Sequence, residues 1–155
     1  MMVRKYVFDT LCGFDEDYFI SFEDVELGWR AAILGYESYL IPSSVVYHLG
    51  GQTIGKISPL ITFHGVKNSL TLVTTHFEKK YVLKNILNLY LHFFYRFLGL
   101  GKSDVDAKFT ISKKNAIKAG IWYFANLNKI WKKHKTLNSQ RKMNSKELEE
   151  LGLIL

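Results

Sequence analysis

The sequence has few of the residues that stabilise small secreted domains. Its 155 residues include one cysteine, Cys12, and two prolines. A single cysteine excludes an intrachain disulfide, and we expect its thiol to be buried in a reduced protein. The sequence has no uncharged apolar run of about eighteen residues, so a membrane-spanning helix is not the first interpretation. No long apolar segment follows Arg4 and Lys5, so a secretory signal is not predicted.

Several motifs that carry chemistry are also absent. The sequence contains no phosphate-binding glycine loop, no zinc-binding cysteine pattern and no Gly-x-Ser-x-Gly nucleophile motif. The histidines at positions 64, 76, 92 and 134 have no second ligand at a metal-binding spacing, so we interpret them as structural or solvated. These absences argue against a P-loop nucleotidase, a zinc-binding module and a serine hydrolase.

The charge is unevenly distributed along the chain, which has a formal net charge of +7. Residues 1–37 contain eight acidic residues, opposed only by Arg4, Lys5 and Arg30. Residues 107–146 contain eleven lysines or arginines and no acidic residue. An acidic beginning and a basic end suggest that the two parts have different partners.

The chain divides into three segments with no internal repeat. Residues 1–57 combine short elements with glycine and proline, residues 58–100 are apolar and mainly helical, and residues 101–155 form a basic, helical tail. In the first segment we predict short strands at residues 36–41 and 45–47. Together these features predict an α/β fold with a mainly helical C-terminal extension.

One helix is predicted between the first glycine-rich turn and the strands. Ser21 can cap its first turn, and Gly35 follows its last residue. Glu23 and Asp24 suit the positive end of the helix dipole. Glu26 and Arg30 are four residues apart, which predicts a surface ion pair. Acidic residues at a helix start are commonly no more than caps, but carboxylates there can also act as a general base or bind a cation.

A second helix, predicted from Tyr81 to Leu100, has a wide apolar face. Its polar residues Lys84, Asn88, His92 and Arg96 recur every four positions and therefore lie in one stripe. Such a helix either lies in a membrane interface or packs against the rest of the domain. In the tail, aromatic residues alternate with lysines, a composition that suits an anionic membrane surface or single-stranded nucleic acid. The preceding apolar helix favours the membrane, so nucleic acid is the less favoured partner.

The segment from Gly13 to Arg30 has a distinctive order of residues. It contains a Gly-Phe-Asp-Glu turn, two aromatic residues, the Glu23-Asp24 pair and a downstream arginine. This order resembles family 2 glycosyltransferases, especially their rhamnosyltransferase-like branch. Lys67-Asn68 stands where that family often has an Arg-Asn pair opening a helix. Cys12 departs from the pattern, which often has glycine there.

The resemblance implies a fold and a set of roles. It implies the acceptor-side half of a GT-A glycosyltransferase fold, in which Asp24 is the general base of an inverting transfer. Glu23 would position the acceptor or tune Asp24 through its like charge. Trp29 and Arg30 would be acceptor-binding or structural. His48 would approach the metal-bound diphosphate, although a lone histidine in this context is also typical of a packed strand residue.

The resemblance also shows what is missing. Such enzymes begin with a nucleotide-binding half that ends in an Asp-x-Asp motif holding Mg²⁺ or Mn²⁺. Here residues 15–17 and 104–106 match that motif only as strings, because neither follows a nucleotide-binding unit. We therefore expect the nucleotide-sugar donor site and its divalent metal to belong to an N-terminal half that lies outside this sequence, whether the chain is a fragment or one product of a split gene. This expectation makes activity of the isolated chain doubtful.

Three hypotheses follow from the sequence. The first is a glycosyltransferase part that transfers a sugar from a nucleotide-sugar to a glycan or lipid-linked acceptor, at the cytoplasmic face of the cell membrane. The second is a non-catalytic module that binds a membrane surface or nucleic acid. The third is a truncated remnant whose first strands lack sheet neighbours and expose an edge.

Overall fold

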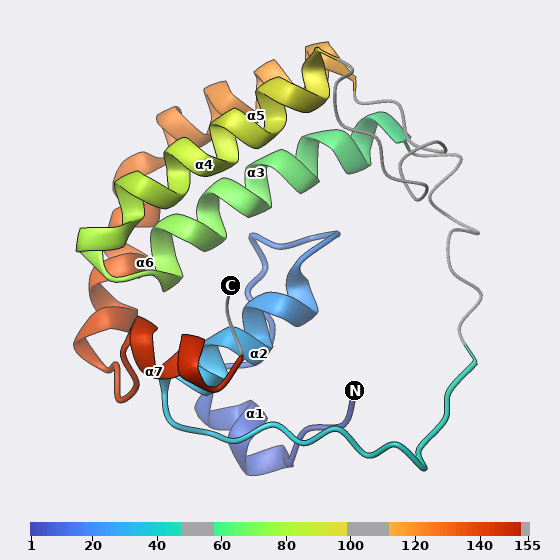
Figure 1. Cartoon of the computed structure of the whole chain (residues 1–155), viewed down its shortest axis with the longest axis vertical. Coiled ribbons are helices and arrows are strands. Elements are labelled where there is room, and N and C mark those ends of the chain that lie inside the picture. Colours follow the sequence, from blue (N-terminus) through green and yellow to red (C-terminus); the bar gives the residue numbers. More distant parts are fainter. Residues whose placement is uncertain (48–57, 99–111, 153–155) are drawn as a thin grey trace.

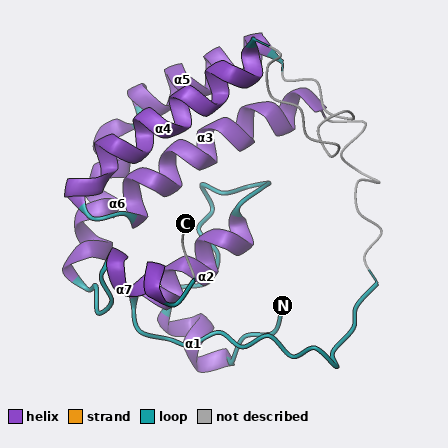
Figure 2. Ribbon diagram, in the orientation of Figure 1, coloured by secondary structure: helices purple, strands orange, loops and turns teal. Residues whose placement is uncertain are grey.

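The computed structural model describes residues 1–47, 58–98 and 112–152. In these residues every regular element is a helix (Figures 1 and 2). In chain order the helices are α1 (Lys5–Thr10), α2 (Glu23–Ile33), α3 (Ser58–His76), α4 (Lys79–Phe97), α5 (Lys113–Ala125), α6 (Leu127–Ser139) and α7 (Ser145–Glu150). Helix α3 packs against α4, α5 and α6, whereas α1, α2 and α7 gather at the other end of the molecule (Figure 1).

The prediction of an α/β fold related to GT-A is wrong, because the described residues contain no strand and no sheet. The two predicted strands, residues 36–41 and 45–47, lie in a loop that crosses the outside of the molecule (Figure 2). Tyr39 is 79% exposed and Tyr47 is 96% exposed. Their composition suits a strand, but a strand forms only where a neighbour accepts and donates its backbone hydrogen bonds. No such neighbour lies beside them in the described residues.

Helix α2 ends where the sequence predicts but begins differently. Gly35 has φ +82°, and the N–H groups of Gly35 and Tyr36 donate to Ala32 O at 2.9 Å and Ala31 O at 3.0 Å. This arrangement is a glycine-terminated helix end, as predicted. The predicted cap at Ser21 is wrong, because Phe22 precedes the helix and no side chain caps it.

The helices of the tail pack directly on α2. Ile33 of α2, Leu137 of α6 and Leu148 of α7 form one buried cluster, and Ile33 and Leu148 are 0% exposed. A second cluster joins Leu70 of α3 to Tyr123 and Ile130. Burying a large aliphatic side chain contributes about 1.5–3 kcal/mol, so the first cluster fixes α2 against α6 and α7, and the second holds α3 against α5 and α6.

The prediction of an apolar helix in the second segment is confirmed. The predicted apolar helix corresponds to α4, and Asn144 caps α7 in a capping box with Glu147. None of the helices in the described residues is long and apolar enough to cross a membrane. Cys12, in contrast, is exposed rather than buried, because it lies in the turn after α1 at φ +59°.

Candidate functional site

The loop before α2 carries an unusual backbone conformation. Ser21 and Phe22 both lie in the left-handed region, at φ +68° and +70°. Residues other than glycine rarely adopt this region, and each such residue costs roughly 1–2 kcal/mol. The chain turns through this strained pair directly into Glu23 and Asp24, the first two residues of α2. The backbone turn at Ser21 and Phe22 therefore places Glu23 and Asp24 at the start of α2.

Helix α3 holds the loop before α2 in place through hydrogen bonds from two of its side chains. The side-chain amide of Asn68, which is 0% exposed, donates to Ile20 O at 2.9 Å and to Ser21 O at 2.6 Å. The neighbouring Lys67 donates from Nζ to the carbonyl oxygen of Asp17. Buried hydrogen bonds of this kind offset the backbone strain, because the carbonyl groups would otherwise lose their partners. Lys67 and Asn68 lie inside α3, so the implied role of this pair in opening a helix is wrong.

Asp24 is exposed, and Glu23 is half-buried. The Oδ1 atom of Asp24 accepts a hydrogen bond from Val25 N at 2.8 Å. The Oε2 atom of Glu23 is buried and has no hydrogen-bond partner among the described residues. The positive end of the α2 dipole favours negative charge at both positions. The arrangement presents the Asp24 carboxylate to solvent at the start of α2, where it can accept a proton from a bound hydroxyl group.

A buried ionic network lies behind the loop. Glu26, 3% exposed, contacts Arg30 at 2.8 Å and the Nε2 atom of His76 at 3.3 Å. Arg30 also donates to the carbonyl oxygens of Leu11 and Gly13, the latter at 2.8 Å. The predicted Glu26–Arg30 pair exists, but it is buried rather than on the surface. Arg30 thus ties α2 to the Gly-Phe-Asp-Glu turn, which is a structural contact.

The acidic turn and the basic tail bind each other. Lys133 Nζ contacts Asp15 and Asp17 at 2.6 Å each, and Lys129 Nζ contacts Asp17 at 2.7 Å. Burial tends to raise the pKa of Asp17, but the hydrogen bonds and charges of Lys129 and Lys133 outweigh it and lower that pKa. The expectation that the two ends have different partners is wrong for these residues. The sequence could not show which lysines of the tail reach the turn.

The predicted site residue Trp29 and two histidines interpreted as structural, His64 and His134, each make packing contacts of their own. Trp29 packs its ring edge-on against Phe77 at 4.9 Å and tilts against His76. Burial, with a smaller contribution from the charge of Lys67, lowers the pKa of His64. His134 stacks on Trp131 at 4.3 Å, and its Nδ1 atom lies 2.7 Å from Thr74 O. His48 and residues 104–106 lie outside the described residues. In the described part of the chain no three metal-binding side chains come together.

Comparison with known proteins gives a partial similarity. No family model and no solved structure matches the chain significantly. Two curated proteins from Mycobacterium tuberculosis strains, each an N-acetylglucosaminyl-diphospho-decaprenol L-rhamnosyltransferase, are 39% identical over 56 residues. The match covers 36% of this chain and 18% of each relative, so the chain matches less than a fifth of their length. The similarity supports a relationship to glycosyltransferases.

Proposed function

We propose that this chain takes part in glycosyl transfer and presents Asp24 as the general base that activates the acceptor hydroxyl. The observation that carries the proposal is the strained pair Ser21–Phe22, held by Asn68 directly before the two carboxylates. Strained backbone that its surroundings hold in place is concentrated at functional sites, where it fixes reactive groups in position. The partial similarity to rhamnosyltransferases supplies the reaction class.

The proposed step is a single displacement. The Asp24 carboxylate takes the proton from an acceptor hydroxyl as that oxygen forms a bond to the anomeric carbon. The bond from that carbon to the nucleoside diphosphate breaks, and the diphosphate leaves with the electron pair. Attack from the opposite face inverts the anomeric configuration. Because Glu23 is adjacent and half-buried, we assign to it the positioning of the acceptor.

We propose that the nucleotide-sugar site, with the divalent metal expected for a complete enzyme, belongs to an N-terminal half outside this sequence. The described residues do not fit a metal site, because Asp15 and Asp17 are occupied by lysines and no other cluster of ligands forms. We therefore route no step through a metal on this chain. The relatives' name specifies a diphospho-decaprenol acceptor, and on that basis we propose a lipid-linked acceptor at the inner face of the cell membrane.

The test is sugar transfer by the chain supplied with a nucleotide-binding half. That half is the product of the reading frame upstream of Met1, if it encodes one, or otherwise the N-terminal half of the mycobacterial relative. Asp24→Asn keeps the shape of the side chain and removes the base, so we expect the rate to fall by about 100- to 10,000-fold. The matched control is Asp9→Asn, which changes another exposed aspartate, one paired with Lys5. Full activity of Asp24→Asn would show that the assigned base is wrong.

A second candidate function is a non-catalytic module that binds an anionic membrane surface. The supporting observation is that helices α3 to α6 contain no acidic residue and carry many lysines. Sedimentation with phosphatidylglycerol vesicles, compared with a gel shift on single-stranded RNA, distinguishes membrane binding from nucleic-acid binding. Vesicle binding without any transfer by the reconstituted pair would favour this candidate.

A further inference from the structure

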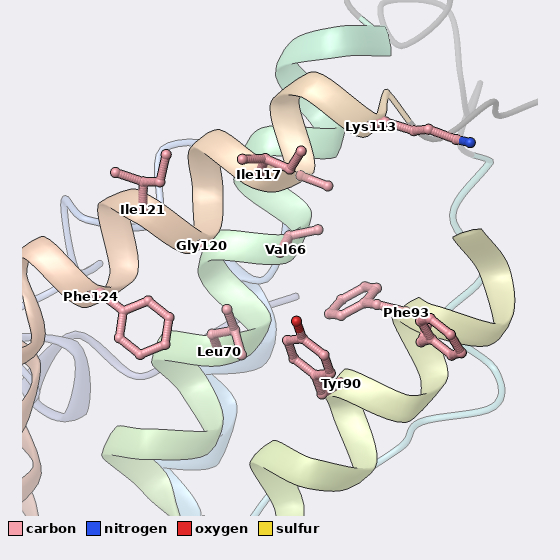
Figure 3. A pocket seen from close by; sticks show the side chains of 11 residues that line it. Val66, Leu70, Tyr90, Phe93, Lys113, Ile117, Gly120, Ile121 and Phe124 are labelled. Carbon is pink, nitrogen blue, oxygen red and sulfur yellow. The ribbon is translucent and has the colours of Figure 1, made fainter. Parts of the chain in front are cut away.

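An apolar pocket of about 450 Å³ lies between α3, α4 and α5 (Figure 3). Its walls include Val66 and Leu70 of α3, Phe93 and Phe94 of α4, and Ile117 and Ile121 of α5. The hydroxyl of Tyr90 points in among these side chains, and Lys113 stands at one end of the pocket (Figure 3). The volume lies within the range of roughly 300–1,000 Å³ that is typical of small-ligand sites.

The helices beside the pocket expose further apolar side chains. On α4, Leu83, Leu87 and Leu91 are each more than half exposed and recur every four residues, so they lie along one face. On α5, the pocket-lining residues Ile121 and Phe124 are themselves 65% and 73% exposed. Soluble proteins rarely leave large contiguous apolar faces open, and such faces mark binding sites. The pocket and its margins therefore suit an apolar ligand longer than the cavity itself.

The side chains near the pocket carry positive charge, which favours an anionic ligand. Helices α3, α4 and α5 contain no aspartate or glutamate, whereas α5 carries Lys113, Lys114 and Lys118. The acidic turn at Asp15 and Asp17 is directed elsewhere, toward α6. An apolar cavity with positive charge beside it complements an anionic amphiphile. A concave cavity also suits a narrow chain better than the broad face of a second protein.

We propose that this pocket binds the isoprenoid chain of an anionic lipid and so holds the lipid-linked acceptor of the reaction. This inference rests on the proposed function, since the lipid acceptor comes from the reaction class. The lysines at the start of α5 lie beside the phosphate groups, and the chain passes between Phe94 and Ile117. Binding at this site keeps the acceptor on the protein while its sugar reaches Asp24.

The experiment is calorimetric titration of the purified full chain with farnesyl phosphate, below the concentration at which it forms micelles and without vesicles. Dimethylallyl phosphate has the same charge and a much shorter chain. Each additional buried methylene strengthens binding about fourfold, so we expect farnesyl phosphate to bind at least tenfold more tightly. Equal affinity for the two compounds would overturn the proposal.

A variant that fills the pocket sharpens the test. A Cβ atom added at Gly120 meets nothing within 4 Å, so Gly120→Leu extends into free space and improves helix propensity. We expect it to weaken farnesyl phosphate binding about tenfold without lowering the melting temperature. Ala125→Leu, at an exposed position on the same helix, is the matched control and should bind as wild type. Unchanged binding by Gly120→Leu, or equal losses in both variants, would overturn the assignment.

A second pair of variants tests the charge without filling the pocket. Ile121 is mostly exposed, so both Ile121→Asp and Ile121→Lys should fold. Both lose the isoleucine contact, but only the aspartate repels a phosphate, so we expect it to bind several-fold more weakly than the lysine variant. Equal binding by the two variants would contradict the charge argument.

Two alternative partners for the apolar face of α4 and α5, a lipid bilayer and a second copy of the chain, predict different experimental results. A bilayer contact would show binding to phosphatidylglycerol vesicles that Gly120→Leu leaves unchanged, with no binding of farnesyl phosphate. A second copy would appear as a dimer in sedimentation, again with no farnesyl phosphate binding. Either result overturns the proposal. Because the titration needs no sugar donor, Asp24→Asn should bind farnesyl phosphate normally, so failure of the base assignment and failure of the pocket are seen separately.

Discussion

The same lysine-rich helical bundle forms two surfaces of opposite kind. At the polar interface, side chains of α2, α3 and α6 hold residues 11–21 through hydrogen bonds and ion pairs. At the apolar face, formed by the exposed apolar side chains of α4 and α5, leucine, isoleucine and phenylalanine point to solvent. The polar interface contacts residues of the same chain, whereas the apolar face is the one that we propose binds a ligand. We therefore expect substitutions at the first to affect mainly stability and at the second mainly binding.

The largest effect is expected for Glu26→Ala, which removes the buried carboxylate that pairs with Arg30. The substitution leaves Arg30, only 16% exposed, without its carboxylate partner. Removing one partner of a buried pair costs about 3–5 kcal/mol in the free energy of unfolding, measurable by urea denaturation. Lys5→Ala removes the exposed pair with Asp9 and should cost less than about 0.5 kcal/mol. Similar costs for the two variants would contradict the burial of the Glu26 network.

The next largest effect is expected for Asn68→Ala. The substitution removes the amide that binds Ile20 O and Ser21 O, and we expect a loss of about 2 kcal/mol in the free energy of unfolding. The loop would also lose its fixed position, so transfer by the reconstituted enzyme should slow even where the variant is fully folded. Asn88→Ala, at an exposed position on α4, should change neither quantity. An unaffected transfer rate in folded Asn68→Ala would show that the hydrogen bonds from Asn68 to the loop are not needed for the reaction.

A smaller, pH-dependent effect is expected for Lys133→Ala. The pKa of Asp17 is lowered in the folded protein, so its contribution is present above the unfolded value of about 3.9 and is lost as the pH falls through the folded pKa. The loss on removing Lys133 should be about 1 kcal/mol at neutral pH and shrink in high salt. Melting temperatures measured from pH 7 down to about pH 3 should fall less steeply in the variant. An equally steep fall would show that Asp17 is not what destabilises the protein in acid.

The smallest effect on stability is expected at the apolar face. Ile117 is 62% exposed, so Ile117→Ser should change the free energy of unfolding by no more than about 0.5 kcal/mol. The same variant should weaken farnesyl phosphate binding, since Ile117 lines the pocket. Ile33→Ser, within the core, is the contrasting variant and should cost several-fold more stability. A large loss in Ile117→Ser would mean that the apolar face is covered in the folded protein.

Local sequence signals predicted several features well. The end of α2 at Gly35 and the helix α4 depend on residues a few positions apart, which a single sequence contains. The strands at 36–41 and 45–47 failed because a strand depends on a distant neighbour. The exposure of Cys12 and the burial of Glu26 failed for the same reason, since both depend on what packs over them. Of the candidate site, the sequence identified the carboxylates but not the strained pair before them or the ion pairs of Asp15 and Asp17.

The hydrogen bonds at the C-terminal end of α2 have a consequence for folding during translation. The carbonyl oxygen of Ile33 accepts from the N–H groups of Lys142 at 2.9 Å and Met143 at 3.1 Å. During translation this contact waits for about 110 further residues, or roughly 5–20 s at ordinary elongation rates. Until then helix α2, which bears Asp24, lacks the hydrogen bonds from Lys142 and Met143 at its C-terminal end. During that interval it is accessible to chaperones and proteases. Contacts this distant in sequence also slow folding, which is unusual for a helical protein.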